Sequence, residues 1–132
     1  MILVLDDNED DLALIGHHFK KHGIVDFKLF NNPEPFLQEI NEEVIIVIID
    51  HYLSSIKTGL DVMKEVVDMN PVCYPIVVSG SNDPNIILDY CNNDVFRYVL
   101  KSSDQKYLDT IVINIRQAEG RIKRIIDYFK NG

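Results

Sequence analysis

Short apolar runs alternate along this chain with amphipathic segments of helical period. The runs are rich in Val and Ile, as expected for strands that are covered on both faces. Five strands are predicted, at residues 2–5, 25–30, 44–49, 74–78 and 95–100. The second run alternates apolar and polar residues, so we place it at a sheet edge.

Helical segments separate these strands. Asn8 can cap a helix with an acidic first turn and a basic last turn, and Gly23 is a natural stop. Four more helices are predicted, from Pro33, from Gly59 to about Met69, from Asp83 and from Ser103 or Asp104. Because no connection has hairpin length, this alternation predicts an α/β fold: a doubly wound, five-stranded parallel sheet with helices on both faces.

Length and charge limit the classes of function. The 132 residues fit one domain, and 13 basic against 21 acidic side chains give a net charge of −8. That surplus argues against direct binding of nucleic acid or an anionic membrane, because the negative charges repel each other. We find no signal peptide and no apolar stretch of the roughly 20 residues that span a bilayer. Cys73 and Cys91 stand alone in the sequence, which fits a reducing cytoplasm.

Polar side chains follow the predicted strands where each one ends. Asp6 and Asp7 follow the first strand, Asp50 the third, Ser79 the fourth and Lys101 the fifth. The carboxyl ends of parallel strands meet at one edge of a sheet, so the acids are expected to lie together and to repel each other unless a cation intervenes. Such oxygen ligands suit Mg²⁺. An Asp carboxylate can also accept a phosphoryl group, whose charge a metal, a lysine and a hydroxyl neutralise.

In this order and spacing, these residues resemble the receiver domain of two-component response regulators, over residues 1–118. Asp50 lies 43 residues beyond Asp7, Ser79 lies 29 residues further on, and Lys101 another 22. The resemblance implies a flavodoxin-like fold with strand order 2-1-3-4-5. It also implies a phosphorelay switch in which Asp50 accepts a phosphoryl group from a sensor histidine kinase or a histidine phosphotransfer protein.

The resemblance assigns a role to each site residue. Mg²⁺ would be held by Asp7, Asp50, the backbone carbonyl of Tyr52 and water, with Asp6 acting directly or through water. Ser79 and Lys101 would bind phosphoryl oxygens, and Ser79 with Tyr98 would form the switch that alters the face made by the fourth helix, fifth strand and fifth helix. The domain would then be a phosphorylatable switch with its own autophosphorylation and autodephosphorylation chemistry, and not an enzyme in the usual sense.

Three departures from the family pattern are visible. Ser102 stands where a proline is usual, and Ser79 stands where threonine is commoner. The loop of residues 51–59 lacks the usual proline and is one residue longer than the commonest form. These departures remove no reactive group, but they leave the lifetime of the phosphoryl group open.

Other functions remain as alternatives. A receiver-like interaction domain that works without phosphorylation is one, although the complete set of acids, hydroxyl and lysine argues against it. A phosphatase of the haloacid dehalogenase type would need an Asp two residues after Asp6, where Asn8 stands. A flavodoxin would need a phosphate loop there, and the acids would repel phosphate. The cognate kinase and the regulated process stay open.

The C-terminal segment has a heptad pattern. Apolar residues recur at Leu108, Ile111, Ile115, Ala118, Ile122, Ile125 and Phe129. We expect the first half to pack on the sheet, and residues 119–132 to form a helical extension that is a dimer seam or a linker to an output module beyond residue 132. Gly120 costs roughly 1 kcal/mol in a helix, so a second short helix that folds back is the alternative. A homodimer could use this extension or the face of the fourth helix, fifth strand and fifth helix.

Two further features concern histidines. His18 and His22 have the i, i+4 spacing of a zinc-binding pair, but no third ligand lies nearby in the sequence. We therefore interpret them as a solvated helix end, and expect neither His17 nor His18 to carry a phosphoryl group. His51, beside Asp50, is expected to be a surface residue of its loop.

Overall fold

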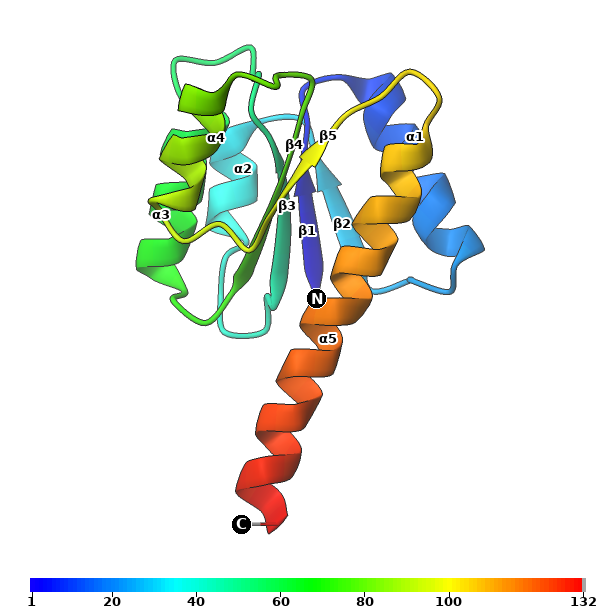
Figure 1. Ribbon diagram of the computed structural model, residues 1–132, viewed down its shortest axis with the longest axis vertical. Coiled ribbons are helices and arrows are strands. Elements are labelled where there is room, and N and C mark those ends of the chain that lie inside the picture. The colour runs from blue at the N-terminus through cyan, green and yellow to red at the C-terminus, as the bar shows by residue number, and fades with distance from the viewer. Residues whose placement is uncertain (132) are drawn as a thin grey trace.

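A computed structural model describes residues 1–131 of the chain and shows one parallel sheet of five strands. The strand order is β2-β1-β3-β4-β5, which confirms the predicted fold (Figure 1). The strands are β1 (Ile2–Leu5), β2 (Phe27–Phe30), β3 (Ile46–Asp50), β4 (Tyr74–Ser79) and β5 (Arg97–Leu100). The helices are α1 (Glu9–Lys21), α2 (Pro33–Gln38), α3 (Gly59–Met69), α4 (Pro84–Cys91) and α5 (Lys106–Asn131).

Helices cover both faces of the sheet. Helices α1 and α5 lie on one face, and α2, α3 and α4 lie on the other (Figure 1). The apolar run of β3 is explained by burial on both of its faces. Ile46 and Ile48 pack in the core under α1 and α5, whereas Val47 and Ile49 pack in the core under the other three helices. Successive side chains of a strand point to opposite faces, so a central strand has no solvated side.

Several element boundaries differ from the prediction. Strands β2, β3 and β5 each begin two residues later than predicted, and Val25, before β2, is 77% exposed. β-Branched residues alone do not make a strand where no neighbouring strand pairs with them. Helix α5 begins at Lys106 instead of Ser103 or Asp104, because Gln105 has φ 63°, in the left-handed region that a right-handed helix excludes.

Helix α5 is one continuous helix of 26 residues that passes through Gly120. The alternative of a second helix folding back is therefore wrong. The four heptad residues of its first half are buried against the sheet, as predicted: Leu108, Ile111, Ile115 and Ala118. Its second half projects past the end of the sheet (Figure 1), with Ile125 52% and Phe129 78% exposed. Within residues 1–131, no helix is both long enough and apolar enough to cross a membrane.

Candidate functional site

The acids at the strand ends meet, as the sequence predicts. Strands β1 and β3 are neighbours with Leu5 opposite Ile49, so the residues that follow these two, Asp6 and Asp50, lie side by side. Asp6 is 2% exposed and Asp50 7%. Together with Asp7, they offer carboxylate oxygens that all lie within 4.8 Å of one another. This is a donor set that a small hard cation can bridge.

Crowding of the carboxylates disfavours the ionised form of Asp50. Its pKa is raised from 3.8 to about 7, chiefly because the carboxyl is buried and then because the charge of Asp6 is close, while Lys101 opposes the rise. The buried carboxylates therefore lack sufficient positive charge to hold them all ionised near neutral pH. A divalent cation among them would supply that charge, so the residues present fit a metal such as Mg²⁺.

Lys101 is the cation of the site. Its ammonium Nζ lies 2.9 Å from Asp11 Oδ2, 3.1 Å from Asp6 Oδ2 and 3.6 Å from Asp50 Oδ2. Burial alone would lower the pKa of Lys101, but the surrounding carboxylates outweigh it and raise the pKa. Asp11 was not among the predicted site residues. Its place in the acidic first turn of α1, just after Asp6 and Asp7, is the signal that could have revealed it.

The main chain fixes each of the three carboxylates. The backbone N–H of Asn8 donates to Asp6 Oδ1 at 2.9 Å, and that of Ser54 donates to Asp7 Oδ2 at 2.7 Å. The N–H of Tyr52 donates to Asp50 Oδ1 at 3.3 Å. The loop after β3 thus bonds to acids at the ends of two different strands, which places its backbone beside the carboxylate cluster.

The structure also places Ser79 and Tyr98 together. Ser79 ends β4 fully buried, and its Oγ accepts a hydrogen bond of 3.0 Å from the backbone N–H of Ser81. The Tyr98 hydroxyl, from β5, donates to the carbonyl oxygen of Ser81 at 2.7 Å. The Tyr98 ring is half-buried, and burial raises its pKa. Ser81 therefore connects the two residues expected to form the switch.

His51 is not the surface loop residue that was expected. It is half-buried, and its Nδ1 is hydrogen-bonded to the hydroxyl of Tyr90, a fully buried residue of α4. Burial lowers the pKa of His51. The Tyr90 ring in turn packs on that of Tyr98, with centroids 5.6 Å apart. The residue after Asp50 is thus linked through α4 to β5, which no local pattern in the sequence indicates.

The family of the chain follows from a comparison with known proteins. Residues 2–113 match the response regulator receiver domain family. The chain belongs to this family. Solved structures share the fold of this receiver domain at low sequence identity. A receiver domain from Clostridium thermocellum has a TM-score of 0.82 and 22% identity, with 94% of this chain and 97% of that chain covered. No curated protein sequence matches the chain.

Two further solved structures add detail. A response regulator from Burkholderia pseudomallei with a phosphorylated aspartic acid, a calcium ion and citrate has a TM-score of 0.75 and 17% identity, with 99% of this chain and 74% of that chain covered. Response regulator DrrB from Thermotoga maritima has a TM-score of 0.76 and 20% identity, with 91% of this chain covered. This chain spans only 52% of the length of the DrrB chain.

Proposed function

We propose that this receiver domain is a phosphorelay switch in which Asp50 accepts a phosphoryl group from a sensor histidine kinase or a histidine phosphotransfer protein. One observation carries the proposal: Lys101 Nζ lies 3.6 Å from Asp50 Oδ2 within a group of three carboxylates. A charged lysine and a metal-binding acid cluster beside one buried Asp are what transfer to a carboxylate requires. The free thiols Cys73 and Cys91 are consistent with our placing the switch in the cytoplasm.

The transfer step uses the ionised form of Asp50. Its carboxylate oxygen forms a bond to phosphorus, the bond from phosphorus to the donor nitrogen breaks, and the electron pair leaves with the donor imidazole. Mg²⁺ supplies charge neutralisation on the phosphoryl oxygens when bound, and would be held by Asp6, Asp7, Asp50 and the Tyr52 carbonyl. Hydrolysis of the acyl phosphate by water would reset the domain.

Ser79 and Lys101 would receive the new phosphoryl oxygens. The Lys101 ammonium would bind one oxygen. The Ser79 hydroxyl, whose proton is not used in the bond that it accepts from the Ser81 N–H, would donate to another and be drawn inward with its loop. The Ser81 carbonyl holds the Tyr98 hydroxyl at 2.7 Å, so a movement of this loop shifts Tyr98 as well. The face of α4, β5 and α5 then changes as a two-state element biased by a local charge.

Phosphorylation with a small donor tests the proposal. The protein is incubated with Mg²⁺ and acetyl phosphate, and intact mass is measured before and after treatment with acid or base. We expect one added phosphoryl group that is stable in acid and labile in base, and that is absent from Asp50→Asn. No modification would favour the phosphorylation-independent interaction domain, and modification that survives Asp50→Asn would exclude Asp50 as the acceptor.

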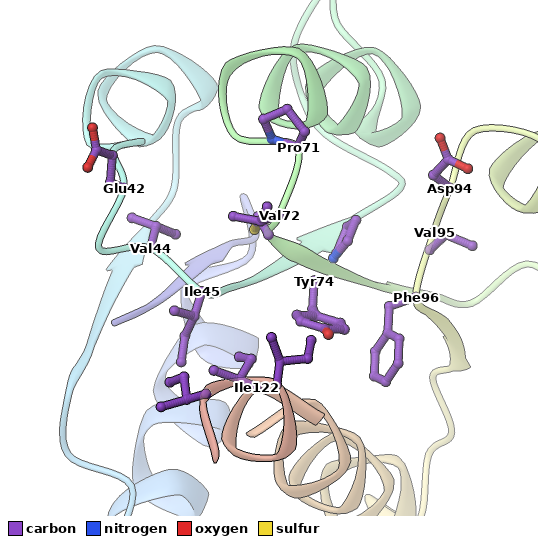
Figure 2. Close-up of a pocket in the computed structure, with 14 residues that line it drawn as sticks. Glu42, Val44, Ile45, Pro71, Val72, Tyr74, Asp94, Val95, Phe96 and Ile122 are labelled. Carbon is purple, nitrogen blue, oxygen red and sulfur yellow. The ribbon is translucent and has the colours of Figure 1, made fainter. Parts of the chain in front are cut away.

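We further propose that residues 1–118 form the receiver domain and that residues 119–132 pair two copies of the chain. The carboxyl-terminal half of α5 borders an apolar groove of about 620 Å³ at the amino ends of the strands, opposite the acids. Figure 2 shows Ile45, Tyr74 and Phe96 facing Ile122 of α5 across this groove. The exposed residues Ile125 and Phe129 continue the same apolar stripe.

Charge supports a second copy as the occupant of this groove. Residues 119–131 carry four basic and two acidic side chains, whereas the whole chain carries 13 basic and 21 acidic. The rim of the groove is acidic at Glu42 and Asp94. The basic extension of one copy is therefore complementary to the acidic rim of another, and a two-fold pair would use both contacts twice.

A further inference from the structure

The structure supplies the third ligand that His18 and His22 lack in the sequence. Helices α1 and α5 lie side by side on one face of the sheet (Figure 1), and Asp109, in the first turn of α5, reaches the two histidines of α1. Ligand atoms of these three residues all lie within 4.8 Å of one another. We propose that His18, His22 and Asp109 form a second metal site, for Zn²⁺ or a similar late transition metal, separate from the phosphoacceptor.

The ligand types fit such a metal. Two imidazoles one helical turn apart on the same face are a known arrangement for zinc, and one carboxylate completes a set of three with a fourth position open to water. Imidazole suits Zn²⁺, whereas Mg²⁺ prefers oxygen ligands such as those of Asp6, Asp7 and Asp50. The two acid-containing sites of this chain are therefore expected to select different metals.

The contact between His18 and Asp109 gives a second, independent observation. His18 Nε2 is buried and lies 2.9 Å from Asp109 Oδ1, yet within residues 1–131 this nitrogen has no hydrogen-bond partner. The oxygen is close but lies off the axis along which the nitrogen would donate. Two ligand atoms of one tetrahedral zinc are about 3.3 Å apart. Neither atom lies on the lone-pair axis of the other, because each lone pair points at the metal between them.

The surrounding contacts dock the two helices that carry the three residues, while the His22 and Asp109 side chains remain exposed. The rings of His18 and His22 are 4.6 Å apart between centroids. The Arg116 guanidinium of α5 donates to the carbonyl oxygen of His22 at 2.9 Å, which ties the end of α1 to α5. The ligands therefore stand on two helices that are already docked, and side-chain rotations suffice to close the site around a metal. A bound metal would in turn pin the first turn of α5 to α1.

Zinc titration of the metal-free full chain tests this proposal. Calorimetry should show one equivalent of Zn²⁺ bound in the presence of excess Mg²⁺, with the ring NMR signals of His18 and His22 shifting and those of His17 unchanged. His22→Gln and Asp109→Asn should each weaken binding by more than about tenfold. His17→Gln, on the same helix but outside the cluster, is the matched control and should bind as the unaltered chain does.

Thermal unfolding provides a second measurement that does not depend on calorimetry. Zn²⁺ should raise the Tm of the unaltered chain and of His17→Gln, and should raise that of Asp109→Asn by less at the same Zn²⁺ concentration. The proposal is overturned if Zn²⁺ does not bind, if excess Mg²⁺ displaces it, or if His17→Gln weakens binding as much as His22→Gln. The first two outcomes leave His18 and Asp109 as a contact without metal, and the third places the zinc at His17 instead of at the cluster.

Discussion

Lys101 Nζ lies closer to Asp11 Oδ2, at 2.9 Å, than to Asp50 Oδ2, at 3.6 Å. The lysine of the site is thus shared between the proposed phosphoacceptor and an acid of α1. Asp11 affects Asp50 in two ways: it adds negative charge nearby, and it draws the ammonium away. Both effects disfavour the ionised form of Asp50.

Asp11→Asn should therefore lower the pKa of Asp50 from about 7. The variant removes one negative charge and frees Lys101 to approach Asp50, and the two changes act in the same direction. Titration of the Asp50 carboxyl carbon by NMR, without divalent metal, measures the effect. Asp10→Asn is the control, since Asp10 is exposed in the same helical turn and makes no ion pair with Lys101. An unchanged or higher pKa in Asp11→Asn would contradict the shared-lysine interpretation.

Stability should fall as pH rises from about 4 to about 7 in the absence of divalent metal. The pKa of Asp50 is 3.8 as a free side chain and about 7 in the folded protein, so in that interval the folded state binds more protons than the unfolded state. The loss amounts to at most about 4 kcal/mol and levels off above the folded pKa. Urea unfolding at several pH values measures it.

Asp50→Asn should remove most of this dependence and be the more stable protein at pH 8. Mg²⁺ should also reduce the slope, because a bound cation favours the ionised carboxylate. Asp68→Asn, on the exposed surface of α3, is the control and should keep the slope of the unaltered chain. A slope that persists in Asp50→Asn would assign the pH dependence to other groups.

Gly59→Ala should destabilise the protein by about 1–3 kcal/mol. A Cβ at this position would overlap the carbonyl oxygen of Asp50 and lie 2.7 Å from His51 Cα, and backbone atoms cannot move aside as a flexible side chain can. Gly80→Ala is the matched control, because a Cβ there meets nothing within 4 Å. Urea unfolding compares the two variants. Equal stabilities would mean that the loop after β3 can shift at little cost.

Ile125→Glu should make the chain monomeric if the extension pairs two copies. It places a charge in the proposed apolar contact, where burial without a partner is costly. Ile113→Glu is the control, since Ile113 is a similarly exposed isoleucine of α5 outside the heptad positions. Light scattering before and after addition of beryllofluoride measures the mass. A monomer in both states of the unaltered chain, or equal loss of dimer in both variants, would exclude pairing through residues 119–132.

Part of the site could be predicted from the sequence. Asp6, Asp7, Asp50, Ser79 and Lys101 could be placed at one edge because each follows an apolar run, and parallel strands end together. The loop of residues 51–59 could not be described from its sequence, because its position depends on hydrogen bonds from Tyr52 and Ser54 to acids of two separate strands. The bond from Ser54 to Asp7 joins residues 47 positions apart and leaves no local pattern.

The sequence by itself determined the order of the elements, the parallel sheet and the residues at the strand ends. Burial on both faces of the central strands forces apolar β-branched runs there and leaves polar residues where those strands stop. Only the tertiary structure decided which side chains meet across elements: Lys101 with Asp11, His51 with Tyr90, and Asp109 with His18. It also decided that α5 continues straight through Gly120. These outcomes depend on how whole helices pack against the sheet and each other. Many residues that are distant in the chain contribute to that packing.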